Sequence, residues 1–156
     1  MDIVLARVDE RLIHGQILNE WVTRTEPTHL VIVDDALVED AFMSNIYKAL
    51  TPLWLDVQIR SVPEAAAGLT DPAAPPGRLI LLAKTPRPFV ELVKRGVTIP
   101  ELTLADKAYF PNKIPVPAEC RRAVNWLLAA GVRVSAQVSP EDPPMPVGPY
   151  KNIPDR

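Results

Sequence analysis

Short apolar runs rich in β-branched residues alternate with amphipathic stretches along the whole chain. We expect strands over residues 3–6, 30–33, 55–60, 79–83, 102–104 and 132–138. We expect helices over residues 15–24, 38–50, 63–68, 86–96 and 117–131, the last of which begins at a proline and stops at a glycine. This alternation is typical of βαβ units. It predicts an α/β fold, a single domain with an open, mostly parallel twisted sheet and helices on both faces.

Proline is frequent, with 18 in 156 residues, and it falls into two groups. Many prolines flank the expected helices and strands, where the missing N–H is tolerated. The others gather in the loop 71–77 and near the C-terminus, where they exclude a central strand or a helix interior. We therefore expect one folded domain over residues 1–142 and a proline-rich C-terminal tail over residues 143–156.

The charge balance and the cysteine content exclude several classes of partner. Seventeen basic and nineteen acidic side chains give a net charge of −2, which provides no basic field for nucleic acid. No apolar stretch approaches the ~20 residues of a membrane helix, and residues 1–3 do not resemble a signal peptide, so we expect a cytoplasmic protein. With Cys120 alone and two distant histidines, we expect no metal site.

A dense group of charged residues, running from Arg7 to His14, follows the first expected strand. In a doubly wound sheet, the loops after the carboxyl ends of strands face the ligand crevice. An unprotonated imidazole nitrogen of His14 can accept a phosphoryl group, whose oxygens Arg7 and Arg11 can hold with planar guanidinium forks. The pattern favours phosphoryl chemistry, but packing of His14 and a solvated surface of charged residues fit it equally well.

Other phosphate contacts are expected around this loop. Gly15 permits close approach of the backbone, and the amides that open the next helix from Gln16 form an anion site. Lys84 ends the fourth expected strand. It would lie across from the His14 loop at the topological switch point, where the strand order of the sheet reverses, and is a further candidate phosphate contact.

The string from Ala6 to Gln16, ARVDERLIHGQ, closely resembles the opening of the IIB subunits of the mannose/fructose/sorbose family of the bacterial phosphoenolpyruvate-dependent sugar phosphotransferase system. The usual family form is Arg-Ile-Asp-Asp-Arg-Leu-Ile-His-Gly-Gln. The resemblance continues through Trp21 and extends to about Asp142. Its other parts are the segments 31–35, 48–52, 131–132 and 139–142.

This resemblance implies a phosphotransferase in which His14 is the phosphohistidine intermediate, at Nδ1. Arg7 and Arg11 would hold the phosphoryl oxygens, and Asp9 would orient an arginine or the loop. No cofactor is implied. The implied partners are a IIA domain as phosphodonor, the IIC and IID membrane subunits, and the sugar that enters through them. The protein would be cytoplasmic and peripherally associated with those membrane subunits.

The segment 102–110 departs from the family pattern, because bulkier and charged residues replace a glycine-containing segment. Lys107 in this segment is a candidate phosphate contact, and Tyr109 would narrow the crevice. The change keeps a second interpretation open. In it the chain is a regulatory IIB-like protein that is phosphorylated by the phosphotransferase relay, the chain of phosphoryl transfers that ends at the IIA domain, without sugar transport. A third, an unrelated α/β enzyme with His14 as general base, lacks a serine or cysteine nucleophile beside the histidine. A homodimer also stays open.

Overall fold

The computed structural model describes residues 1–109 and 115–154, so Phe110 of the altered segment and residues 155–156 of the expected tail lie outside the described residues. One seven-stranded sheet runs through the fold in the order β3-β2-β4-β1-β5-β6-β7. Its strands are β1 (Asp2–Val8), β2 (His29–Val33), β3 (Asp56–Arg60), β4 (Arg78–Ala83), β5 (Glu101–Leu104), β6 (Arg133–Ala136) and β7 (Met145–Pro146). All pairings are parallel except β6 with β7. The prediction of a single-domain, mostly parallel α/β fold is confirmed.

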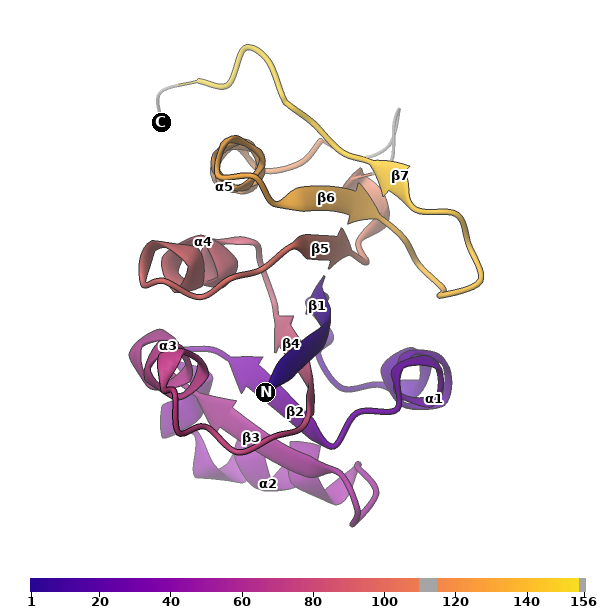
Figure 1. Ribbon diagram of the computed structural model, residues 1–156. Helices are drawn as coiled ribbons and strands as arrows, with labels where there is room; N and C mark the ends of the chain where they lie inside the picture. The colour runs from indigo at the N-terminus through magenta and orange to yellow at the C-terminus, as the bar shows by residue number, and fades with distance from the viewer. Residues whose placement is uncertain (110–114, 155–156) are drawn as a thin grey trace.

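Helices cover both faces of the sheet (Figure 1). On one face α3 (Val62–Thr70), α4 (Arg87–Lys94) and α5 (Ala118–Ala129) lie side by side. The other face carries a π-helical turn, η1 (Ile17–Trp21), that continues into α1 (Val22–Thr25). Two apolar cores result, one beneath the three helices and one beneath η1. Right-handed crossovers explain the division, because the chain moves one way from β1 to β3 and the other way from β3 to β6.

Two elements differ from the predictions. The expected helix over residues 38–50 is a 3-10 turn, η2 (Leu37–Glu39), followed by α2 (Ala41–Ala49). Asp40 divides them because its non-helical backbone lets its side chain cap Met43 N at 3.0 Å. The strand β7 was not predicted, since proline is unfavourable in a ladder, but an edge strand tolerates it. After β7, Val147 is buried in the core and two hydrogen bonds join Asn125 to the Tyr150 backbone.

The position of β1 in the sheet determines where the loop that follows it lies. It lies between β4 and β5, and the hydrogen-bonding pattern continues one residue beyond its end. Asp9 N donates to Ala83 O at 2.9 Å, and Ala105 N donates to Val8 O at 2.9 Å. The loop after β1 is therefore held between the loops after β4 and β5. Among the residues that the structure describes, no helix has the length and apolar character to cross a membrane.

Candidate functional site

A tight turn shapes the loop that follows β1. Leu12 N donates to Asp9 O at 2.9 Å, and Leu12 has a φ of 56°, in the left-handed region that leucine rarely adopts. Its side chain is fully buried, as is nearly all of Ile13. These two apolar side chains anchor the loop in the core beneath η1. The charged residues on either side of them are thereby fixed at the edge of the sheet.

His14 and Asp9 form the central pair of the site. His14 Nε2 lies 2.6 Å from Asp9 Oδ2, and the Asp9 carboxylate is only 2% exposed. A carboxylate oxygen only accepts hydrogen bonds, so Nε2 carries the proton, and the neutral tautomer that fits leaves Nδ1 unprotonated. Gln16 N donates to that same Nδ1 at 3.3 Å, a contact that needs an electron pair on Nδ1. The side chain of His14 is 16% exposed, so the imidazole is partly accessible to solvent.

Arg11 is held by the other oxygen of the same carboxylate. Its backbone N donates to Asp9 Oδ1 at 3.0 Å, and its Nε lies 3.5 Å from that oxygen. The side chain is 60% exposed, and within the described part of the chain its terminal guanidinium nitrogens make no hydrogen bond. Asp9 therefore orients both Arg11 and His14. The structure brings Asp9, Arg11 and His14 together as the sequence predicted.

Arg7 has a different environment, because it is fully buried beneath η1. Its Nη1 donates to Gln137 O at 2.7 Å and to Thr103 Oγ1 at 3.3 Å, and its Nη2 donates to Val138 O at 2.8 Å. Burial lowers the pKa of the Arg7 guanidinium to about 10, against the opposing charge of Asp9. Arg7 thus ties the first strand to the segment after β6. Its prediction as a phosphate ligand stays untested.

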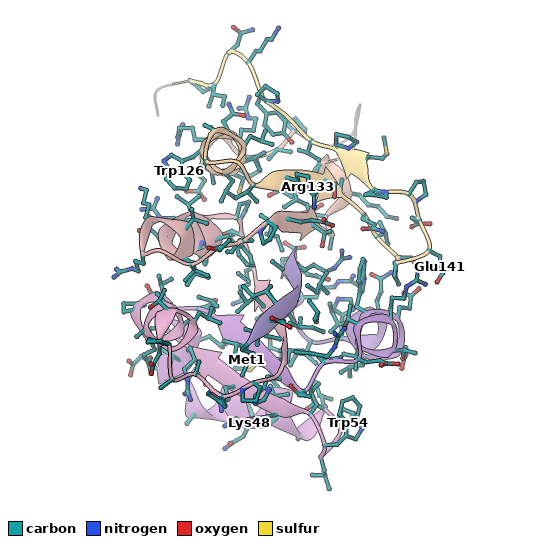
Figure 2. The ribbon with its side chains drawn as sticks, viewed as in Figure 1. Met1, Lys48, Trp54, Trp126, Arg133 and Glu141 are labelled. Atoms are coloured by element: carbon teal, nitrogen blue, oxygen red, sulfur yellow. The ribbon has the colours of Figure 1, made fainter. Side chains whose placement is uncertain are left out.

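The segment 137–142 forms one wall beside the site, which the sequence interpretation did not identify. Trp21 Nε1 donates to Val138 O at 3.1 Å, and the Trp21 ring lies 4.4 Å from the Arg7 guanidinium carbon. Glu141 reaches toward α1 (Figure 2), where it accepts a hydrogen bond from Arg24 at 2.8 Å. Backbone carbonyls carry no sequence signal.

Gly15 and Gln16 open the helical stretch directly after His14. A side-chain carbon added at Gly15 would meet nothing nearer than Asn19 Nδ2, at 3.7 Å, so the backbone surface there is open. The stretch then forms the π-helical turn η1, a rare conformation that recurs at functional sites. The helix predicted from residue 15 is confirmed, and its first amides lie next to the imidazole.

Lys84 and Lys107 flank the loop from the two neighbouring strands. Lys84 follows Ala83 at the end of β4, is about half-exposed, and lies 3.8 Å from Asp34 Oδ2. Lys107 is exposed and begins a 3-10 turn, η3 (Lys107–Tyr109), beyond β5. Both lysines therefore stand at the carboxyl edge of the sheet, where the sequence predicted them.

Tyr109 and the acids after β2 have structural roles at the carboxyl edge of the sheet. Tyr109 packs on the core, and burial raises the pKa of its hydroxyl and of the Cys120 thiol that contacts it. Asp35 Oδ1 accepts from Val62 N at 2.7 Å and so caps α3, and Asp34 accepts from Leu37 N at 2.8 Å. Over residues 1–109 and 115–154, no three histidine, cysteine, aspartate or glutamate side chains gather as a metal ion would need.

The sequence and the fold match one family of known proteins. The family model described as the PTS system sorbose subfamily IIB component matches residues 3–150. A sorbose-specific EIIB component of Lacticaseibacillus casei is 30% identical, over 92% of this chain and 91% of that protein. The mannose-specific EIIAB component of Escherichia coli K12 is 26% identical over 92% of this chain, which spans 46% of that longer protein.

A solved structure agrees with these sequence matches. The crystal structure of the IIBSor domain of the sorbose permease from Klebsiella pneumoniae has a TM-score of 0.84 and 25% identity, and the match covers 94% of this chain and 93% of that domain. The resemblance drawn from the segment around His14 is thereby confirmed over nearly the whole chain. The chain belongs to the sorbose subfamily of IIB components of the phosphotransferase system.

Proposed function

We propose that the protein is a phosphocarrier that accepts a phosphoryl group on His14 from a IIA domain and passes it to an incoming sugar. The observation that carries the proposal is the pair of contacts on the imidazole. Asp9 Oδ2 accepts a hydrogen bond from Nε2–H at 2.6 Å, and Nδ1 keeps its electron pair beside the start of the helix. A nucleophile with a fixed tautomer beside an exposed guanidinium is what in-line phosphoryl transfer needs.

The transfer needs no proton abstraction by the protein. The electron pair on Nδ1 attacks phosphorus, and the bond from phosphorus to the donor nitrogen breaks, so the donor imidazole leaves with that electron pair. The His14 ring then carries a positive charge, because Nε2 keeps its proton. The buried Asp9 carboxylate stabilises that charge and holds the ring orientation, as the aspartate of a Ser-His-Asp triad does. In the second step a sugar hydroxyl oxygen attacks phosphorus, Nδ1 regains its pair, and the hydroxyl proton goes to solvent or to a base of the sugar-binding subunits.

Cationic and amide groups around His14 supply the phosphate contacts in this proposal. Arg11 is the main one, because its terminal nitrogens face solvent and form a planar fork for two oxygens. The amides of Gly15 and Gln16 add hydrogen-bond donors, and Lys84 and Lys107 add charge from both sides. Arg7 contributes a positive charge beneath the loop, and its hydrogen bond to Val138 O holds the segment 137–142 in place.

The proposed partners follow from family membership. A IIA domain donates the phosphoryl group, and the IIC and IID subunits present the sugar at the membrane, with this protein cytoplasmic and peripherally bound to them. We place the relay in residues 1–142. Among the described residues, those after 142 form no hydrogen bond with residues 9–16, although β7 extends the sheet.

One observation favours a second candidate function, a regulatory IIB-like protein. In the segment after β5, Tyr109 packs against the core where the family has a glycine-containing segment. In this second proposal the bulkier segment limits how closely a sugar-binding subunit can approach His14. Phosphorylation would then report the state of the relay without sugar transport.

Labelling separates these functions. The protein is incubated with labelled phosphoenolpyruvate, the general phosphotransferase proteins and a matching IIA domain, and we expect an acid-labile, base-stable phosphate. Absence of label with a competent IIA domain contradicts both functions. Membranes that hold the cognate IIC and IID subunits are then added with sugar. Formation of sugar phosphate supports transport, and stable label without sugar phosphate supports regulation.

A further inference from the structure

The end of the sheet formed by β3 and α2 is far from the proposed relay and has several unusual features. In the described part of the chain, β3 is a terminal strand and pairs only with β2. Beside it α2 has no buried residue, although Met43 and Tyr47 pack on the core. Figure 2 shows Trp54 and Lys48 at this end of the molecule. The exposed large apolar residues of α2 and the turn after it are Phe42 (73%), Leu50 (55%), Leu53 (106%) and Trp54 (64%).

The backbone of β3 presents hydrogen-bonding groups to the outside. Asp56 N donates to Thr28 O, and Arg60 O accepts from Asp34 N, so alternate residues 56, 58 and 60 face β2. Val57 and Ile59 therefore direct their N–H and C=O groups away from the sheet. Within the described residues no backbone hydrogen bond occupies these groups. A strand edge of this kind pairs readily with another strand.

The side chains of β3 are arranged so that the strand complements itself. Asp56, Gln58 and Arg60 share one face, and Gln58 links them, with Nε2 3.4 Å from Asp56 Oδ1 and Oε1 2.5 Å from Arg60 Nη2. A negative charge thus lies two residues before Gln58 and a positive charge two residues after it. The Asp56 side chain is 50% exposed, and its Oδ2 lies 3.6 Å from His29 Nε2.

We propose that this edge binds a second copy of the same chain, with the two β3 strands antiparallel about a two-fold axis at Gln58. In that register Val57 lies opposite Ile59 of the partner subunit, and each pair exchanges two backbone hydrogen bonds. Asp56 lies opposite Arg60 of the partner subunit, which gives two cross-strand ion pairs on the exposed face. The self-complementary charge order selects a second copy rather than another protein.

The exposed apolar residues fit the same arrangement. Leu53 and Trp54 precede β3, at the amino ends of the strands, whereas Phe42 lies where α2 begins, near the carboxyl ends. An antiparallel two-fold pairing brings the amino end of one subunit beside the carboxyl end of the other. Each Trp54 then approaches the Phe42 region of the partner subunit, so that the apolar side chains at both ends of α2 are covered. His14 stays outside this interface, so the proposal does not rest on the proposed function.

A charge-reversal cycle on the full-length protein tests the ion pairs. Sedimentation velocity over about 1 µM to 1 mM covers weak and moderate dimers. We expect concentration-dependent dimers, and we expect Asp56→Arg or Arg60→Asp to raise the dimer dissociation constant at least about tenfold, because two attractive pairs become repulsive. The double variant Asp56→Arg/Arg60→Asp restores the pairing. The matched control is Arg133→Asp, which removes an exposed arginine of β6 that pairs with Glu101 at 3.1 Å.

The result that overturns the proposal is a wild-type protein that stays monomeric throughout, or a dimer that the single charge reversals leave unchanged. A double variant that stays as weak as the single ones also contradicts the register. Circular dichroism reports whether each variant is folded, and labelling of His14 by a IIA domain is measured separately. If a folded, dimeric protein is not labelled, that result contradicts the proposed function and leaves the dimer proposal unaffected.

Oxidative cross-linking tests the position of the axis independently. The two Gln58 residues form a non-hydrogen-bonded antiparallel pair, whose Cα atoms lie about 4.5 Å apart and suit a disulfide. With copper-phenanthroline and dissolved oxygen taking the two electrons and two protons of the thiols, we expect Gln58→Cys to form a covalent dimer. Asp56→Cys, exposed on the same face, is the control, because its sulfurs lie about 13 Å apart. Equal cross-linking of the two variants, or none of Gln58→Cys, contradicts the proposal.

Discussion

The molecule contains two histidine–aspartate pairs at opposite ends of the sheet, and they differ in almost every physical respect. At the carboxyl ends, His14 Nε2 is 2.6 Å from an Asp9 carboxylate that is 2% exposed. At the amino ends, His29 Nε2 is 3.6 Å from an Asp56 carboxylate that is 50% exposed, a distance too long for a hydrogen bond. His29 Nδ1 lies 2.7 Å from Thr28 Oγ1, so both of its nitrogens have neighbours.

The difference shows what converts a histidine into a candidate nucleophile. A buried carboxylate fixes one tautomer, whereas an exposed one is screened by water and leaves the ring free to reorient. The His14 pair also has Arg11 on the same carboxylate and the first amides of a helix beside Nδ1. The His29 pair has an arginine nearby too, Arg78, but it binds the carbonyls of Thr25 and Glu26.

The largest expected effect comes from removing the His14 imidazole, and removal of the His29 imidazole is the comparison. We expect His14→Ala to abolish phosphorylation by a IIA domain, because no other group supplies the nucleophile, and His29→Ala to retain wild-type labelling. The measurement is the amount of acid-labile phosphate per protein after incubation with labelled phosphoenolpyruvate. Label that survives in His14→Ala and disappears in His29→Ala would reverse the comparison.

The fold was predictable from the sequence to the extent that local patterns decide it. The strands that became β1 to β6 are short apolar runs whose alternation with amphipathic helices has few other solutions. The strand β7 was not predictable, because Met145 and Pro146 pair with β6 only through the position of an edge. The break at Asp40 depends on a capping hydrogen bond, which a periodic pattern does not reveal.

The site was likewise predictable only where residues close together in the sequence form it. Asp9, Arg11 and His14 lie within six residues, so their spacing and the family resemblance were enough to group them. The position of Arg7 depends on the backbone carbonyls of Gln137 and Val138, which lie 130 and 131 residues further along the chain and have no sequence signature. Long-range contacts of this kind require the folded topology.

The second prediction sharpens the contrast between the two aspartates. We expect Asp9→Asn to slow phosphorylation of His14 by roughly 10²–10⁴-fold, because an amide neither fixes the same tautomer nor stabilises the positive ring. Asp56→Asn removes a comparable charge and is expected to leave the labelling rate unchanged. Rates are measured by rapid quench with phosphorylated IIA domain in excess. Equal rates for Asp9→Asn and wild type would remove the proposed role of Asp9.

The third prediction compares two arginines that bind carbonyls, one buried and one exposed. Replacing Arg7 by Met leaves the carbonyls of Gln137 and Val138 without buried donors and is expected to cost about 3 kcal/mol of unfolding free energy. Arg78→Met, at an exposed arginine, is expected to cost less than about 1 kcal/mol. Urea denaturation followed by circular dichroism measures both values. Similar losses for the two variants would mean that burial does not distinguish them.

The smallest expected effect comes from replacing Arg11, which binds the same Asp9 carboxylate as His14. Arg11→Lys keeps the positive charge but loses the planar fork, so we expect labelling of His14 to slow about tenfold at unchanged stability. Stability is unaffected because the Arg11 side chain is 60% exposed. Arg24→Lys, at an arginine that is 59% exposed, is the matched control. A labelling rate for Arg11→Lys equal to that of the control would show that charge alone, without bidentate geometry, serves the phosphoryl group.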